Sequence, residues 1–216
     1  MQNVDQKLAS MIDHTLLKAN ATRAEIKKIC SEAVEYGFKT VCVNPYYVSL
    51  AANILQGSQV EVCTVIGFPL GANSSDTKAY EVKKAVQDGA TELDMVINIG
   101  ALKSGDYAFV KRDIQQVIEA AQGRLVKVIF ETCLLNELEK VQLAKICYET
   151  GADFLKTSTG FSTGGATKED VKLLKQIVPM KVKAAGGIKT RAQALEFVEA
   201  GADRIGASAG INLVLL

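Results

Sequence analysis

One pattern occurs four times in the sequence: EYGFKTVCVN (35–44), QDGATELDMVIN (87–98), ETGADFLKTS (149–158) and EAGADRIGAS (199–208). In each copy an amphipathic segment ends at a glycine, and an apolar run follows at once. Glycine readily adopts the left-handed conformation that closes a helix, so each copy predicts a junction between a helix and a strand. The spacing of the junction glycines leaves room for two βα units of roughly 25 to 30 residues in each interval. These glycines are Gly37, Gly89, Gly151 and Gly201.

Short apolar runs closed by turn residues predict the intervening strands. These runs are EVCTVIGF (61–68), RLVKVIFET (124–132) and MKVKAAGG (180–187), and MIDHT (11–15) adds a short first strand. Helix starts alternate with them: Thr22, Asn136 and Thr167 each precede an acidic residue by three positions, and Thr190 opens a further helix. About eight strands alternating with helices predict a parallel α/β fold, a single-domain (β/α)8 TIM barrel spanning residues 1–216.

The composition indicates a protein that acts on a small molecule in the cytoplasm. The chain has 216 residues, 48% of them hydrophobic, and a formal net charge of +1. We expect no nucleic-acid partner, because no run of five or more like charges is present. We expect no membrane association, because MQNVDQKLASMIDHT (1–15) lacks a signal pattern and no stretch approaches the ~18 apolar residues of a span. Five cysteines without CxxC spacing favour a reducing compartment. A single histidine, His14, argues against a histidine-rich metal site, although carboxylates alone could hold magnesium.

Charged residues interrupt strands that a barrel buries on both faces and that are therefore expected to be apolar. They are Asp13, Asp94, Lys127, Lys156 and Lys183. Thr15 falls on the same face as Asp13 by the two-residue alternation of a strand. One lysine at a strand end is usually a solvated rim residue, and Lys181, which begins its strand at the opposite mouth, is interpreted in that way. Charges on five different strands instead predict convergence at the carboxyl-terminal mouth, where barrel enzymes have their active sites.

Clustered lysines can provide a reactive amine. An isolated lysine has a pKa of ~10.4 and is almost entirely protonated at neutral pH. A second ammonium ~5 Å away, at an effective dielectric constant of ~20, costs about 3 kcal/mol and lowers that pKa by roughly two. Neutral amines attack carbonyl carbons to form iminium ions, which act as electron sinks for cleavage of the adjacent carbon–carbon bond. Asp94 is then a candidate base, acting directly or through a water.

The residues alone leave Lys127, Lys156 and Lys183 as alternative nucleophiles. Lys156 is favoured because hydroxyl side chains follow it, beginning with Thr157, that can solvate an iminium and accompany proton transfer. We therefore expect Lys156 to be the nucleophile, and we expect Lys127 and Thr157 among the residues that bind the substrate.

Glycine-rich turns follow the last two predicted strands. AAGGIKT (184–190) and RIGASAG (204–210) stand where helices begin, and barrels commonly bind phosphate there with backbone N–H groups. The alternative is that these are tight turns without a ligand, and Lys189 either adds charge or is solvated. We expect phosphate contacts from Gly160, Gly186, Gly187, Gly206 and Ser208.

With these residues taken together, the sequence resembles the deoxyribose-phosphate aldolase family over essentially its whole length. The most specific segment is FLKTSTG (154–160), whose lysine, Lys156, matches the imine-forming lysine of the family. VKAAGGI (182–188) matches a second lysine at Lys183, and ELDMVIN (92–98) matches the catalytic aspartate at Asp94. IDHTLL (12–17) and VCVNP (41–45) match segments near the substrate. The resemblance therefore implies substrate contacts from Asp13, Thr15, Leu17 and Cys42.

The resemblance implies reversible cleavage of 2-deoxy-D-ribose 5-phosphate to D-glyceraldehyde 3-phosphate and acetaldehyde, without a metal or an organic cofactor. Lys156 would form the imine, Lys183 would keep Lys156 unprotonated, and Asp94 would move protons with a water. Two departures are present. Phe161 stands where some relatives have a phosphate-binding lysine, and the sequence ends at INLVLL (211–216), without the terminal tyrosine of some relatives. We therefore expect a less basic phosphate pocket, and proton transfer that depends more on water, Asp94 and Lys183.

Two other functions remain open from the sequence. A sugar-phosphate isomerase would use Asp94 and a lysine to enolise a carbonyl, and it would form no adduct that borohydride traps. A noncatalytic phosphate-metabolite-binding barrel would give no turnover. A homo-oligomer, either a dimer or a tetramer, is a further expectation, with Tyr46, Tyr47 and INLVLL (211–216) as candidates for either a subunit interface or the core.

Overall fold

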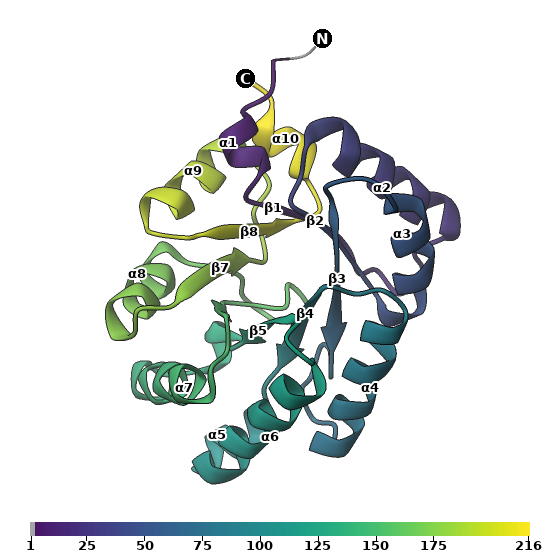
Figure 1. The fold of residues 1–216 in the computed structure, drawn as a ribbon. Helices are drawn as coiled ribbons and strands as arrows, with labels where there is room; N and C mark the ends of the chain where they lie inside the picture. The colour runs from purple at the N-terminus through teal and green to yellow at the C-terminus, as the bar shows by residue number, and fades with distance from the viewer. Residues whose placement is uncertain (1–2) are drawn as a thin grey trace.

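The computed structural model describes residues 3–216, which form a closed barrel of parallel strands surrounded by helices (Figure 1). Each strand pairs with the next in the sequence, and the last pairs with the first. The predicted single-domain (β/α)8 barrel is confirmed, and residues 1 and 2 of the predicted range lie outside the described residues. The strands are β1 (Ile12–Leu16), β2 (Thr40–Val43), β3 (Glu61–Ile66), β4 (Glu92–Val96), β5 (Leu125–Ile129), β6 (Phe154–Lys156), β7 (Lys181–Ala185) and β8 (Arg204–Ala207).

Helices cover the outside of the barrel, and the first and last helices lie side by side (Figure 1). The backbone N–H of Asp5 donates to the carbonyl oxygen of Val214 at 2.9 Å, so the first and last helices are joined. The helices are α1 (Gln6–Ala9), α2 (Arg23–Tyr36), α3 (Val48–Leu55), α4 (Ser75–Gln87), α5 (Ile99–Lys103), α6 (Tyr107–Ala120), α7 (Glu137–Thr150), α8 (Lys168–Ile177), α9 (Arg191–Glu199) and α10 (Gly210–Val214), with 3-10 turns η1 (Pro45–Tyr47) and η2 (Thr132–Leu134).

The helix ends follow the signals in the sequence. Thr22 and Asn136 each open a helix with a capping box, in which the side chain accepts from the backbone N–H three residues on and that residue's carboxylate accepts in return. Thr167 and Thr190 cap α8 and α9. Gly37 ends α2 in the left-handed conformation, with φ of 72°, and the chain turns directly into β2. These local signals fix where each strand begins, and so fix the alternation that points its side chains inward.

Apolar side chains pack in two places. A large core lies between the strands and the helices. A smaller cluster of Leu17, Cys42, Cys63 and Val65, with Phe68 against it, lies inside the barrel. The inside of the barrel is thus apolar and sulfur-rich beside β2 and β3, whereas the charged strand residues fill the remainder. The apolar and the charged side chains thus lie on different sides of the barrel interior.

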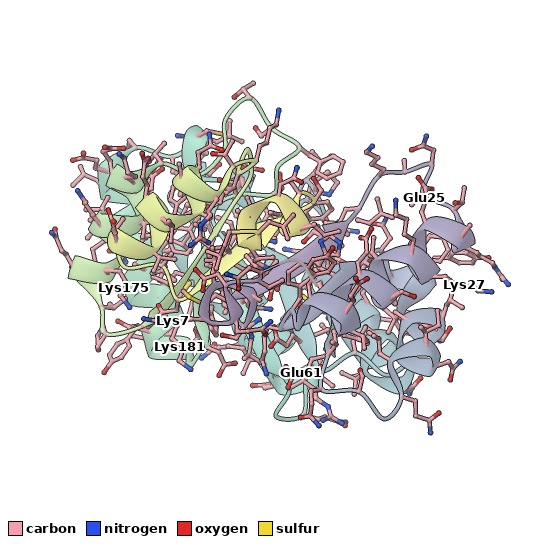
Figure 2. All side chains as sticks on the ribbon, turned by 90° about the horizontal axis from the view of Figure 1, so that it is seen from above. Lys7, Glu25, Lys27, Glu61, Lys175 and Lys181 are labelled. Carbon is pink, nitrogen blue, oxygen red and sulfur yellow. The ribbon has the colours of Figure 1, made fainter. Side chains whose placement is uncertain are left out.

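Lys181 behaves as the sequence interpretation expected. It is exposed, and Figure 2 shows it toward the same end of the barrel as Glu61, the first residue of β3. Of the candidates for a subunit interface, Tyr46 is 72% exposed, whereas Leu213 and Val214 belong to the core. Within residues 3–216, none of the helices combines the length and the hydropathy that crossing a bilayer requires.

Candidate active site

The carboxylate of Asp94 is the centre of a buried ionic network inside the barrel. Its Oδ2 accepts hydrogen bonds from Lys156 Nζ and Lys183 Nζ, each at 2.7 Å. Its Oδ1 accepts from Lys127 Nζ at 2.8 Å and from the thiol of Cys63 at 3.2 Å. Strand alternation explains the convergence, because the register pairs Asp94 with Lys127 and Lys156 with Lys183. The three predicted lysines and the predicted aspartate therefore meet at one carboxylate.

A second layer of charges lies deeper in the barrel. Lys127 Nζ is 2.5 Å from Glu92 Oε2 and 3.8 Å from Asp13 Oδ2. Arg204 donates to Glu92 Oε1 at 2.6 Å and also to Asp13, and Lys183 binds Asp13 on the other side. Sequence interpretation missed Glu92 and Arg204. The signal was present, because each is a charged residue in an apolar strand run, and Glu92 lies two residues before Asp94 and so on the same face.

The network has one more cation than it has carboxylates. Within residues 3–216 it joins the carboxylates of Asp13, Glu92 and Asp94 to the side chains of Lys127, Lys156, Lys183 and Arg204. All of them are buried. Because isolated buried charges are costly, each carboxylate is stabilised by lying between cations, and the network becomes neutral when one of the four cations loses a proton.

The electrostatic environment holds most of these groups in their charged forms. Burial opposes ionisation of Asp94, but the charges of Lys127, Lys156 and Lys183 outweigh it and hold the pKa of Asp94 well below its usual range. Burial alone would lower the pKa of Lys183, but Asp13 and Asp94 raise it well above its usual value. The same balance raises the pKa of Lys127. The repulsion expected between clustered lysines is therefore outweighed, at Lys127 and Lys183, by carboxylates that lie between them.

The three lysines differ in their access to a cavity at the carboxyl-terminal mouth. This cavity, of about 200 Å³, is bordered by Lys156, by Thr15 and Leu17 at the end of β1, and by the loops that follow β6, β7 and β8. Lys127 and Lys183 lie beneath it, fully buried among the carboxylates. Lys156 pairs with Asp94, while its side chain reaches the cavity. Of the three lysines, Lys156 is thus the one that a small molecule can contact.

The predicted phosphate residues gather on one wall of this cavity. Gly160, Gly186, Gly187, Gly206 and Ser208 all border it, although Gly206 lies in β8 and the others come from the loops after β6, β7 and β8. Gly186 and Gly187 have φ of 94° and 81°, a backbone conformation that favours glycine. A Cβ added at Gly206 would lie 2.9 Å from Cε of Lys183, so Gly206 also makes room for that lysine. Exposed Lys18 and Lys189 border the cavity and add positive charge to it.

Other predicted site residues lie beneath the cavity or hold its walls. Asp13 and Cys42 are fully buried below the floor, and neither borders the cavity. The hydroxyl of Thr157 donates to the carbonyl oxygen of Ala185 at 3.2 Å and accepts from its N–H at 3.1 Å. Thr157 therefore joins β6 to β7 and does not border the cavity. The sequence interpretation had expected its hydroxyl to face the substrate and solvate an iminium.

Glu131 is a third residue that sequence interpretation missed. Its carboxylate is buried and accepts from the backbone N–H of Thr159 at 3.3 Å and from the hydroxyl of the same residue. Thr159 in turn accepts from the N–H of Phe161 at 3.0 Å. Glu131 has φ of 54°, which is uncommon for a residue other than glycine. Nothing in the sequence at the end of β5 indicates this role, because the partner is 28 residues away in the next loop.

Phe161 forms an apolar edge of the cavity. It is 54% exposed and packs edge-on against Phe68, with ring centroids 5.2 Å apart. Phe161 brings no charge to the cavity, and the expectation of a less basic pocket stays a prediction. The positive charge near the cavity comes from Lys18 and Lys189 instead.

Comparisons with known proteins agree with this geometry. A family model described as DeoC/LacD family aldolase matches residues 7–215. A deoxyribose-phosphate aldolase from Finegoldia magna is 59% identical over 210 residues, which cover 96% of this chain and 99% of the relative. One from Clostridium tetani is 58% identical over 211 residues, covering 96% of this chain and 98% of the relative.

Solved structures extend the likeness to three dimensions. The structure of QR15, an aldolase, has a TM-score of 0.92 at 45% identity and covers 95% of this chain and 93% of its own. The deoxyribose phosphate aldolase from Aeropyrum pernix, described as a unique tetramer, has a TM-score of 0.90 at 35% identity and covers 96% of this chain and 89% of its own. A family match over nearly the whole length, on a barrel whose lysines meet at one carboxylate, leads to one conclusion: the chain belongs to the DeoC/LacD family of aldolases.

Proposed function

We propose that this aldolase cleaves 2-deoxy-D-ribose 5-phosphate reversibly to D-glyceraldehyde 3-phosphate and acetaldehyde, through an imine on Lys156. The observation that carries the proposal is the access of Lys156 to the cavity, while Lys127 and Lys183 are enclosed by carboxylates. A nucleophile has to touch its substrate, and a cation enclosed by carboxylates keeps its proton. The names of the relatives supply the substrate, and the glycine-rich wall supplies a place for its phosphate.

In the proposed reaction the unprotonated amine of Lys156 adds to the aldehyde carbon C1, and loss of water gives an iminium ion. A base removes the proton of the hydroxyl on C3, the C2–C3 bond breaks, and glyceraldehyde 3-phosphate leaves. The bonding electrons form an enamine, which takes a proton at C2 to become the iminium of acetaldehyde, and water releases it. Asp94 lies 2.7 Å from the reacting nitrogen and moves these protons directly or through a water.

Lys183 has a positioning role in this proposal. It shares Asp94 Oδ2 with Lys156 and remains protonated, so it is a permanent positive charge beside the nucleophile. That charge disfavours a second ammonium nearby. Loss of the proton from Lys156 also removes the excess charge of the network. The charge of Lys183 and the charge balance of the network therefore both favour the unprotonated amine of Lys156 in this proposal.

The phosphate is proposed to bind at the wall formed by Gly160, Gly186, Gly187, Gly206 and Ser208. Backbone N–H groups of glycine-rich turns are suited to an anion, and a glycine allows close approach of the main chain. Lys18 and Lys189 supply charge that Phe161 does not, from exposed positions at the cavity.

The test is borohydride trapping with acetaldehyde, followed by intact mass and peptide mapping. The expected result is one ethyl group added to Lys156, and no adduct in Lys156→Ala. An adduct on Lys183 or Lys127 in the unmodified protein would reassign the nucleophile. Turnover of the sugar phosphate without any trapped adduct would support an isomerase or another noncovalent reaction, and binding without turnover would support the noncatalytic barrel.

We further propose that the chain acts in the cytoplasm as a homo-oligomer. The cysteines are free, which suits a reducing compartment, and the Aeropyrum pernix relative is described as tetrameric. Tyr46, at the surface, is the candidate interface residue. Light scattering coupled to size-exclusion chromatography gives the mass directly, and a monomer across the working concentration range would contradict the oligomer.

A further inference from the structure

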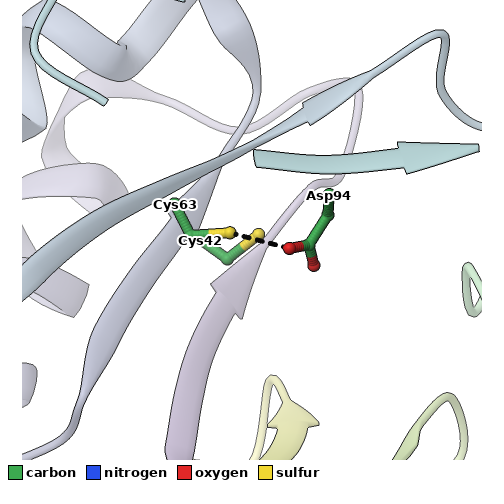
Figure 3. A group of neighbouring side chains, drawn as sticks. All are labelled: Cys42, Cys63 and Asp94. Carbon is green, nitrogen blue, oxygen red and sulfur yellow. Dashed lines mark hydrogen bonds between the residues drawn. The ribbon is translucent and has the colours of Figure 1, made fainter. Parts of the chain in front are cut away.

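Two thiols lie inside the barrel directly beside the carboxylate of Asp94 (Figure 3). Cys42 on β2 and Cys63 on β3 are opposite each other in the strand register, and both are fully buried. The thiol of Cys63 donates to Asp94 Oδ1 at 3.2 Å. One ligand atom from each of the three residues lies within 4.8 Å of the other two. The aldol reaction proposed above uses Asp94 but gives this pair of thiols no part.

These distances suit a small ion bound by sulfur and oxygen. Zinc lies about 2.3 Å from a thiolate and about 2.1 Å from a carboxylate oxygen, and tetrahedral geometry then separates two sulfur ligands by about 3.8 Å. The ligand atoms of Cys42, Cys63 and Asp94 lie within 4.8 Å of one another, and Cys63 Sγ is 3.2 Å from Asp94 Oδ1, so the three groups are near enough to bind one ion. Three protein ligands also leave a fourth position for a water or an anion.

A second group of possible ligands is already filled. Asp13, Cys63 and Glu92 also lie within 4.8 Å of one another, but Lys127 Nζ is 2.5 Å from Glu92 and 3.5 Å from the sulfur of Cys63. Arg204 binds both carboxylates of this group. A metal ion there would have to displace two cations. On the Cys42 side of Asp94, an ion displaces thiol protons and competes with one cation, Lys127, at Asp94 Oδ1 and at the sulfur of Cys63.

The charge of the network does not forbid the exchange. A divalent ion enters and two S–H protons leave, so the total charge is unchanged. The hydrogen bond from Cys63 lowers the pKa of Cys42, against the effect of burial, and the ammonium groups of Lys183 and Lys156 act in the same direction. Burial raises the pKa of Cys63 well above its usual value, so the second proton leaves only when the metal bond replaces it.

We propose that Cys42, Cys63 and Asp94 form an inhibitory site for thiophilic divalent ions of the Zn²⁺ and Cd²⁺ class. Thiolates select such ions over Mg²⁺ and Ca²⁺. An ion bound at Asp94 Oδ1 adds positive charge to the carboxylate whose Oδ2 accepts from Lys156, so Asp94 becomes a weaker base for the proton transfers that follow imine formation. The inhibition rests on the proposed aldol function, whereas the binding does not.

The experiment is a titration of the reduced protein with Cd²⁺, followed by the ultraviolet charge-transfer band of cadmium thiolates. The expected result is one ion bound per chain, reversed by EDTA and displaced by Zn²⁺. Because at least one and at most two protons leave, the affinity should rise between roughly 10- and 100-fold for each unit of pH. An affinity that is independent of pH would refute binding by thiols.

Variants identify the ligands. Cys42→Ser and Cys63→Ser are each expected to weaken Cd²⁺ binding by at least about 10-fold, as loss of a metal ligand does. Cys133→Ser is the matched control, because this thiol is exposed and outside the barrel interior, and its band should be unchanged. A band that survives in both inner variants, or that disappears with Cys133, would overturn the site.

Inhibition is measured in the same solutions. Aldol cleavage should fall as the band grows and recover with EDTA. Full activity with the site occupied would overturn the inhibitory role, because Asp94 would then remain an effective base. If the protein cleaves no deoxyribose 5-phosphate at all, the proposed function fails, and the absorbance titration still decides whether the metal site exists.

Discussion

Replacement of Lys183 by leucine tests whether a neighbouring cation makes Lys156 reactive. Lys183 donates to the same oxygen of Asp94 as Lys156 does, and it also binds Asp13. Its removal leaves the buried network with equal numbers of cations and carboxylates. Lys156 then becomes a cation that the carboxylates need, so it should release its proton less readily. We expect slow imine formation at neutral pH that improves at high pH.

The magnitude follows from the shared oxygen. Two ammonium groups about 5 Å apart at an effective dielectric constant of about 20 repel each other by about 3 kcal/mol. Loss of that repulsion reduces the rate of trapping at neutral pH by roughly 100-fold, since each 1.4 kcal/mol corresponds to a factor of about ten. Each added unit of pH should restore up to about ten-fold, until the amine is fully unprotonated.

The assay is the initial rate of borohydride-trapped ethyl adduct on Lys156, measured between neutral and alkaline pH. Lys181→Leu is the matched control, because Lys181 lies two residues earlier on the same strand but is exposed at the opposite end of the barrel. Its rate should equal that of the unmodified protein. Circular dichroism separates slow chemistry from misfolding. A Lys183→Leu protein that is folded and traps at the unmodified rate, or one whose loss is the same at every pH, would refute the reasoning.

Further predictions concern the phosphate wall, the packing of Lys183, the acid limit and metal dependence. Ser208→Asp should raise KM for the phosphorylated sugar more than it lowers turnover of unphosphorylated deoxyribose, because a phosphate contact cannot affect a substrate that lacks one. Gly206→Ala should displace Lys183, whose Cε would lie 2.9 Å from the new Cβ, with a cost of about 1–3 kcal/mol in unfolding free energy and a trapping profile like that of Lys183→Leu. Asp13 and Asp94 have lowered pKa values in the folded chain, so the stability that they contribute is present above their unfolded pKa of about 3.9 and is lost as the pH falls below it. Thermal melts should show a smaller loss between neutral pH and acid in Asp94→Asn, from a lower starting Tm. Cleavage activity should survive EDTA.

Each of these outcomes has a clear opposite. Equal losses on both substrates would show that Ser208 does not serve the phosphate. Unmodified trapping in Gly206→Ala would mean that Lys183 accommodates the methyl group, so the close approach has no consequence. An unmodified acid dependence in Asp94→Asn would place the acid-sensitive groups elsewhere. Activity lost in EDTA and restored by a divalent ion would end the imine mechanism.

The barrel could be predicted well from the sequence, because the signals that start and end its helices are local. A capping box such as that of Thr22, or a glycine such as Gly37, uses interactions within a few residues, and the structure reproduces them. Strand alternation also predicted that the charged side chains point into the barrel, and there the three lysines donate to Asp94. The contact between Glu131 and Thr159 could not be predicted in this way, because Thr159 lies in a loop that reaches Glu131 from the next βα unit.

The depth of each residue in the barrel was the quantity that alternation could not supply. Alternation assigns a face, but the register between strands sets the height, and it places Lys127 and Lys183 among carboxylates while Lys156 reaches the cavity. Glu92 and Arg204 then have a consequence beyond their own ion pair. In the deeper layer, Glu92 pairs with Lys127 and Arg204 pairs with Asp13, so these groups stay charged. The excess positive charge of the network therefore lies on the lysines nearer the cavity. In the proposed mechanism the reactive amine is therefore selected by its position: of the four cations in the network, Lys156 is the one with a single carboxylate partner and an open side.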